Sequence, residues 1–146
     1  PTMIYGDPHD GNLSNIARII RWFGFYPIVG RGDGLRQPIH VSEVADSCLS
    51  VLKSTTLRDT IYEISGGEVL SYKQMVIRVF EYLGRKPLIL SLPLKLFRIV
   101  IKIVTKFGMV SSISPSMADR MNRDLCFGHE RAAKDFGFKP GSFYYR

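Results

Sequence analysis

Strand-forming segments are few in this chain, and helix-forming segments lie between most of them. The runs with strand-like composition cover residues 1–6, 26–29, 37–41, 60–64 and 88–90. Elsewhere apolar residues recur at a spacing of three and four, as on one face of a helix. This order predicts a mixed α/β or α+β fold. Because the strands are few and separated, a self-contained sheet is hard to assemble from them.

Helix ends are marked by capping residues and glycines. Gly24 stops an apolar stripe that begins at Leu13, and Ser42 is expected to cap the second helix. Ser71 and Gln74 form a capping box at the start of the third. The predicted helices cover residues 13–23, 43–53, 72–83, 93–108 and 114–125, with a short last helix within 128–138 that stops at Gly137.

The chain is basic. Lysine and arginine exceed aspartate and glutamate by 20 to 13, for a net charge of +7. This excess favours an anionic partner, which can be a phosphorylated small molecule, a lipid surface or a nucleic acid. No nucleic-acid-binding motif is present, so a nucleic acid is not the expected partner. Cys48 and Cys126 lack metal-ligand spacing, so the sequence predicts no metal site and a reduced, cytoplasmic protein.

A basic amphipathic segment covers residues 93–107. At about 100° per residue, its four cations fall on one stripe and its apolar side chains fill a broad opposite arc. Four charges in a short segment exclude an ordinary transmembrane span. Two interpretations stay open: a core helix with a solvated cationic edge, or a helix that lies on a membrane or docks a partner.

The N-terminus reads Pro-Thr-Met-Ile-Tyr-Gly, without an initiator methionine or a signal-peptide pattern. The chain thus begins inside a predicted strand. We therefore expect it to be one domain or fragment, residues 1–146, of a longer protein.

Three stretches of the chain match known sequence patterns. Pro1-Thr2-Met3-Ile4-Tyr5-Gly6 is similar to Arg-Pro-Thr-x-x-Tyr-Gly. The run from Gly32 to Ala45, Gly-Asp-Gly-Leu-Arg-Gln-Pro-Ile-His-Val-Ser-Glu-Val-Ala, resembles Gly-x-Gly-x-x-Arg-x-x-x-His-Val-x-Asp-Val-Ala and is the most specific of the three. Arg131 to Pro140 resembles a closing Lys-Ala-x-x-x-Leu-Gly-Phe-x-Pro. Together the three stretches resemble the extended short-chain dehydrogenases/reductases, the NAD-dependent epimerase/dehydratase family.

The resemblance implies the C-terminal, substrate-binding part of a Rossmann-type enzyme. Such a parent would bind NAD or NADP in an N-terminal half that this chain lacks, and a nucleotide-sugar partly in this half. Its reaction would be epimerisation, dehydration or reduction through a transient hydride transfer. Homo-oligomer formation and peripheral membrane contact are left open.

Two sequence motifs of catalysis and cofactor binding are not supplied by this chain. No Gly-x-x-Gly-x-x-Gly turn opens a helix, so none of the residues is expected to hold a dinucleotide pyrophosphate. Tyr82 and Lys86 match the family's Tyr-x-x-x-Lys literally, but Gly84 and Pro87 end the helix inside the match. The two side chains then cannot share a helical face. We expect no catalytic residue here and no cofactor binding by this chain alone.

The resemblance points to five candidate site residues. Arg36 corresponds to an arginine that pairs with the diphosphate of a nucleotide-sugar, and we expect it to be solvent-accessible in a cleft. Arg123, with its neighbour Arg120, is a candidate for a second anion contact. His40 is either a substrate contact or a structural histidine, and Pro1 and Tyr5 would lie near the nicotinamide of the parent. The rival function is a non-catalytic family member that uses segment 93–107 for assembly, membrane contact or partner docking.

Overall fold

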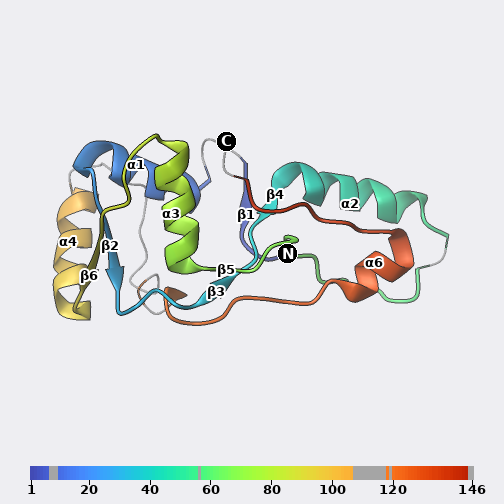
Figure 1. The fold of residues 1–146 in the computed structure, drawn as a ribbon. Coiled ribbons are helices and arrows are strands. Elements are labelled where there is room, and N and C mark those ends of the chain that lie inside the picture. Colours follow the sequence, from blue (N-terminus) through green and yellow to red (C-terminus); the bar gives the residue numbers. More distant parts are fainter. Residues whose placement is uncertain (7–9, 56, 107–117, 119, 145–146) are drawn as a thin grey trace.

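The computed structural model describes residues 1–6, 10–55, 57–106, 118 and 120–144. The described elements, in chain order, are β1 (Ile4–Tyr5), α1 (Leu13–Phe23), β2 (Tyr26–Val29), β3 (Leu35–Arg36), β4 (Ile39–His40), α2 (Val41–Lys53), β5 (Leu70–Ser71), α3 (Tyr72–Tyr82), β6 (Ile89–Leu92), α4 (Leu94–Lys106) and α6 (Glu130–Phe136). The molecule is elongated, with α1, α3 and α4 at one end and α2 and α6 at the other (Figure 1).

The strands form three separate pairs rather than one sheet. β1 pairs with β4 and β2 pairs with β6, both parallel, and β3 pairs with β5 antiparallel. Among the described residues, no third strand joins any of these pairs. The mixed α/β fold class is confirmed, and so is the expectation that these strands build no continuous sheet.

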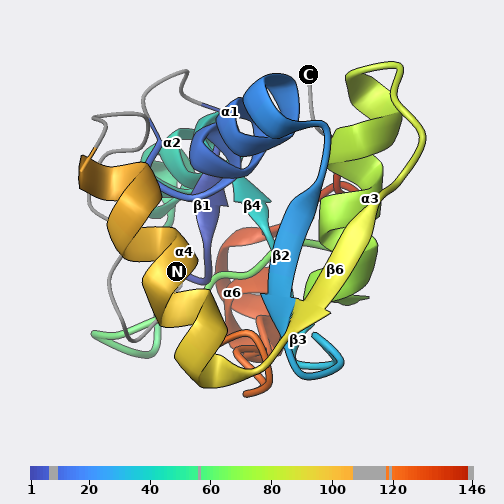
Figure 2. The ribbon, with the colours of Figure 1, turned by 90° about the vertical axis from the view of Figure 1, so that its left-hand side faces the viewer.

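The larger core lies around β2 and β6. α1 contacts α3 and β2, and α4 also contacts β2 (Figure 2). Helices therefore cover β2, whereas β6 keeps exposed positions. The most enclosed side chains come from α1, β2 and α3, and include Leu13, Ile16, Ile20, Tyr26, Met75, Val76, Val79 and Phe80. Apart from Tyr26 of β2, these are apolar positions on the predicted inner faces of α1 and α3, so the sequence predicted most of the main core.

A smaller core lies at the other end of the molecule. Ile39, Ala132 and Phe138 are buried there, with partly buried apolar side chains packed against them. α2 buries only Ser47, while Leu49 is 52% and Leu52 is 82% exposed. A helix normally stays in place by burying an apolar face. The described residues leave this face of α2 without such a cover.

One predicted helix start agrees with the structure and another does not. Ser71 and Gln74 form the predicted capping box: the Gln74 N–H donates to Ser71 Oγ at 3.1 Å, and the Ser71 N–H donates to Gln74 Oε1 at 2.8 Å. The prediction that Ser42 caps α2 is wrong. The N-cap is His40, whose Nδ1 accepts from the Ser42 N–H at 3.2 Å, while its own N–H donates to Glu43. The imidazole takes the place that a serine hydroxyl fills in an ordinary cap.

Two predicted helix ends agree with the structure, and a third does not. Gly24 and Gly137 end α1 and α6 in the left-handed conformation, as predicted. Positions 107, 108, 114–117 and 119 of the predicted helices 93–108 and 114–125 lie outside the described residues. The prediction that the second of these helices continues to Leu125 is wrong, because residues 121–125 are not helical and Leu125 bridges to Arg36.

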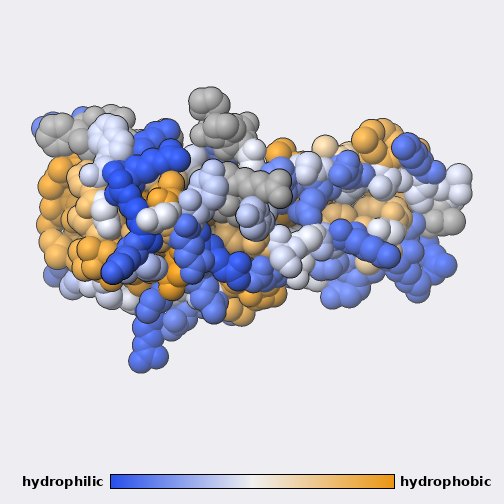
Figure 3. All heavy atoms as spheres, turned by 45° about the horizontal axis from the view of Figure 1, so that its top comes forward, coloured by the Kyte–Doolittle hydropathy of each residue, from blue (hydrophilic) through white to orange (hydrophobic). Residues whose placement is uncertain are grey.

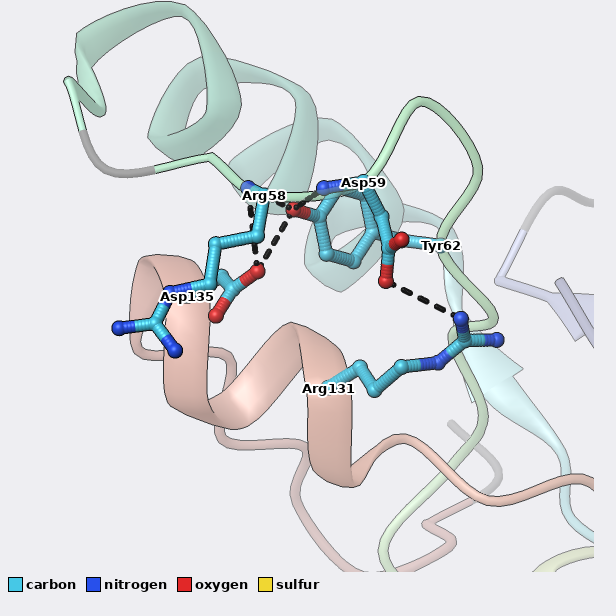
Figure 4. A network of polar contacts seen from close by, with 5 residues as sticks. All are labelled: Arg58, Asp59, Tyr62, Arg131 and Asp135. Atoms are coloured by element: carbon cyan, nitrogen blue, oxygen red, sulfur yellow. Dashed lines mark hydrogen bonds and ion pairs between the residues drawn. The ribbon is translucent and has the colours of Figure 1, made fainter.

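The predicted strand 60–64 is wrong. One backbone hydrogen bond, from the Thr2 N–H to the Ile64 carbonyl at 3.1 Å, joins this segment to the residues before β1. Tyr62 fixes the segment instead. Its hydroxyl accepts from the backbone N–H groups of Arg58 and Asp59 at 3.0 Å and donates to the Asp135 carboxylate at 2.8 Å (Figure 4). These bonds tie the loop to α6 and replace a strand ladder.

We expect Tyr62→Phe to lower the free energy of unfolding by about 1–3 kcal/mol, because it leaves two backbone donors and a carboxylate without this partner. Arg131→Ala is the matched control, because it removes a neighbouring but exposed 3.0 Å ion pair with Asp59. Its effect should stay under about 1 kcal/mol. Urea unfolding followed by circular dichroism measures both. Equal losses for the two variants would contradict the role given to Tyr62.

Candidate anion-binding cavity

A cavity of about 250 Å³ opens between the N-terminal segment, α1, β3, α3 and the segment 120–127. We call it the Arg36 cavity. Its walls carry Pro1, Thr2, Met3, Asn12, Ile16, Arg36, Tyr72, Met75, Arg120, Leu125 and Phe127. Most of these side chains are apolar, with two arginines among them. An apolar cavity with a few polar groups is the usual form of a small-molecule site.

Arg36 is fixed in the wall by backbone carbonyl groups. Its Nη1 donates to the carbonyls of Leu35 and Arg123, both at 2.7 Å, and its Nη2 donates to the carbonyl of Arg120. The side chain is only 3% exposed, so the expectation of a solvent-accessible arginine is wrong. The expectation that Arg36 lies in a cleft is confirmed, because Arg36 lines the cavity wall. A guanidinium has five N–H donors, so at most two remain for a ligand.

The Tyr72 ring lies against the guanidinium of Arg36. The Arg36 Cζ lies 5.5 Å from the centroid of the Tyr72 ring, a distance at which a cation and an aromatic face attract each other. The Tyr72 hydroxyl lies 2.8 Å from that of Tyr26, and both side chains are buried. Burial raises the pKa of Tyr72 to about 12, so the hydroxyl stays protonated. The tyrosine pair therefore fixes the plane on which Arg36 rests.

The charge of Arg36 is not balanced by an ion pair in the part of the chain that the structure describes. Burial lowers the pKa of Arg36 from its usual value, but an arginine stays protonated in proteins. Arg120, exposed at the same cavity, adds a second cation. A buried cation is costly unless it is paired. The cavity is therefore suited to an anionic ligand that brings its charge to Arg36.

Close backbone packing explains the glycine two residues before Arg36. A β carbon at Gly34 would lie 2.6 Å from the Arg123 carbonyl oxygen and 2.8 Å from that of Met121. The Gly34 N–H donates to the Met121 carbonyl at 3.1 Å, and the Leu35 carbonyl accepts from Leu125 at 2.9 Å. Only glycine allows this approach. It brings the segment 120–125 onto β3 and places the carbonyls that hold Arg36.

The other predicted site residues lie in different places. Pro1 lines the Arg36 cavity. The carbonyl oxygen of Arg123 accepts a hydrogen bond from Arg36. The Arg123 side chain is exposed and does not line the cavity, whereas Arg120 does. His40 and Tyr5 meet edge to face, with ring centroids 5.2 Å apart, away from the cavity wall. The structural interpretation of His40 fits its position as the cap of α2.

Sequence reasoning missed several wall residues, chiefly Asn12, Tyr72 and Phe127. Tyr72 has the spacing of a core position, so no local signal separated it from its apolar neighbours. Phe127 is a large aromatic side chain, 45% exposed, close in sequence to the two candidate arginines. An exposed aromatic residue beside cations was the one signal that could have drawn attention to this segment.

The described part of the chain shows no residues arranged to bind a dinucleotide or a metal ion. Gly30, Gly32 and Gly34 lead into β3 rather than into a helix, so they do not fit a dinucleotide pyrophosphate. α3 ends at Tyr82, before Lys86, as predicted for the literal Tyr-x-x-x-Lys match. Within the described ranges, no three side chains are grouped to hold a metal ion. In the same ranges, no helix has the length and apolar composition needed to cross a membrane.

Comparison with protein-family models gives no match, and neither does comparison with curated proteins. Solved structures do resemble the chain. UDP-glucose 4-epimerase from Thermotoga maritima, in complex with UDP-glucose, matches with a TM-score of 0.60 and 18% identity, covering 95% of this chain and 38% of its own. dTDP-glucose 4,6-dehydratase from Bacillus anthracis, in complex with NAD, matches with 0.59 and 16%, covering 95% and 37%. A Bordetella bronchiseptica enzyme in complex with NAD and UDP matches with 0.63 and 12%, covering 98% and 37%.

These similarities concern the fold, since all three identities are low. This chain spans less than two fifths of the length of each of the three structures. The mixed α/β arrangement agrees with the part of those proteins that the chain covers. The chain has the fold of the C-terminal part of the Rossmann-type extended short-chain dehydrogenases/reductases, the group of NAD-dependent epimerases and dehydratases.

Proposed function

We propose that this chain is the substrate-binding part of an NAD(P)-dependent nucleotide-sugar epimerase, dehydratase or reductase. In this proposal the Arg36 cavity receives the diphosphate of the nucleotide-sugar. The observation that carries the proposal is the buried Arg36 guanidinium in the cavity wall, held by three carbonyls and by no described carboxylate. The fold is in line with it, because similar structures were solved with UDP-glucose and with UDP.

Each wall residue has a part in this proposal. The remaining N–H groups of Arg36 donate to phosphate oxygens, since a planar guanidinium matches two oxygens of one phosphate. Arg120, which is exposed, adds a second charge at the cavity wall. Tyr72 keeps the Arg36 plane in place, and Phe127 offers an apolar surface to the nucleoside. Binding would then depend on positions that β3, α3 and segment 120–127 fix together.

The cofactor enters this proposal only through the rest of the parent protein. NAD or NADP would supply the transient hydride acceptor there. Among the described residues of this chain, none is arranged to hold the pyrophosphate of a dinucleotide. We expect the chain by itself to bind the nucleotide part of the substrate without catalysing its conversion.

The first test removes the exposed cation and leaves the backbone unchanged. Arg120→Ala keeps the carbonyl oxygen that accepts from Arg36, so we expect the thermal unfolding midpoint to stay the same. UDP binding in the full-length protein should weaken by about 1.5–3 kcal/mol, the range for a hydrogen bond to a charged group. Isothermal titration with UDP measures the affinity.

Arg21→Ala is the matched control, because Arg21 is an exposed arginine of α1 that does not line the cavity. Its UDP affinity should equal that of the unchanged protein. If Arg120→Ala and Arg21→Ala bind UDP equally well, the cavity is not the diphosphate site.

A further inference from the structure

α4 has an inner face that belongs to the larger core. Phe97 is 2% exposed, and Leu94 and Val100 are partly buried against the same core, which fixes the rotation of the helix. The interpretation of residues 93–107 as a core helix is therefore correct for this face. A core helix would be expected to present polar side chains on the remaining surface.

The outer surface of α4 is instead partly apolar. Leu96 is 46%, Ile99 53% and Ile103 51% exposed. Their spacing of three and four residues places them on one stripe of the helix, which we call the α4 apolar stripe. Hydrophobic residues gather at the end of the molecule where α4 lies, the left end of the surface in Figure 3. Scattered surface leucines need no explanation, but a contiguous apolar stripe marks an interaction surface.

Cations lie beside this stripe. Lys95, Arg98, Lys102 and Lys106 are all exposed, and helical geometry places them on the surface between the apolar stripe and the inner face. No acidic residue occurs anywhere in α4. The helix thus offers the solvent an apolar stripe with a row of positive charge along one side of it.

We propose that α4 is a docking surface for an anionic lipid bilayer, independent of the Arg36 cavity. An interfacial helix places apolar side chains at the boundary of headgroups and acyl chains and cations among the headgroups. Leu96, Ile99 and Ile103 supply the first element, and the cationic row supplies the second. The described α4 has 13 residues, fewer than the roughly 20 that a transmembrane helix needs, so the proposed contact is peripheral.

Charge argues against a second copy of the chain as the occupant. A two-fold contact between copies brings the same surface patch of both subunits together, which would set two cationic rows against each other. α4 lies at one end of the molecule (Figure 1). An anionic bilayer satisfies both the charge and the apolar stripe at that end.

Vesicle flotation with the full-length protein tests the proposal. The probes are phosphatidylcholine vesicles with and without phosphatidylglycerol, at low and at high salt. We expect binding to the phosphatidylglycerol vesicles that falls with salt, and at least about tenfold weaker binding to phosphatidylcholine alone, since each cation near an anionic leaflet contributes on the order of fivefold. Leu96→Ser with Ile99→Ser and Ile103→Ser should weaken binding by about tenfold or more.

Two variants with the same net charge distinguish the effect of the α4 cations on vesicle binding from the effect of the protein's net charge. Lys95→Gln with Arg98→Gln and Lys106→Gln should lose most of the binding. The control replaces the exposed lysines at positions 53, 134 and 139 by glutamine, which lowers the net charge equally at the other end of the molecule. Equal loss in both variants, equal binding to both vesicle types, or an α4-dependent dimer in sedimentation without vesicle binding would each overturn the proposal.

Discussion

Arg36→Ala is expected to weaken UDP binding in the full-length protein by about 10- to 150-fold, which corresponds to about 1.5–3 kcal/mol. The substitution removes the buried cation of the cavity wall. It also removes the guanidinium donor from the carbonyls of Leu35, Arg120 and Arg123. The Leu35 and Arg120 carbonyls keep backbone donors, but the loss of three hydrogen bonds should still lower stability. Isothermal titration with UDP at a temperature well below the unfolding midpoint measures the binding loss.

Arg36→Lys distinguishes the lost charge from the lost geometry. Lysine keeps the cation but cannot donate to three carbonyls and a phosphate in one plane. We therefore expect an affinity between those of Arg36→Ala and the unchanged protein. A folded Arg36→Ala variant with unchanged UDP affinity would remove Arg36 from the site and leave its role structural.

The 146-residue chain by itself is expected to self-associate. Leu49 and Leu52 of α2 are exposed, and each of the two parallel pairs is only two strands wide among the described residues. Parallel strands are normally covered on both faces, and unpaired strand edges invite partners. Multi-angle light scattering of a dilution series should give a mass above that of the monomer.

Leu49→Ser with Leu52→Ser should weaken this association by about tenfold or more for each leucine, since burial of one such side chain is worth about 1.5–3 kcal/mol. Trp22→Ser is the control, because Trp22 is exposed on α1 at the opposite end of the molecule. A stable monomer at all concentrations would mean that the chain closes its own core, and would count against its being one part of a larger fold.

Local sequence signals succeeded where the physical cause was local. Ser71 and Gln74 cap α3, and Gly24 and Gly137 end their helices, because a cap depends on a few neighbouring backbone groups. The same reasoning failed at Ser42, because His40 can fill the capping position with an imidazole nitrogen. It failed again at residues 60–64. Their composition is typical of a strand, but the contact of Tyr62 with α6 holds them in a loop.

By itself, the sequence determined the fold class, the apolar faces of α1 and α3, and the choice of Arg36 as the central candidate. It did so because periodicity, capping and the Gly-Asp-Gly-Leu-Arg motif are all contained in short segments. Only the tertiary structure decided that Arg36 is buried, that Tyr72 supports it and that Arg120, not Arg123, faces the cavity. These facts depend on carbonyls and rings that lie tens of residues away along the chain and meet only when segment 120–125 packs over Gly34.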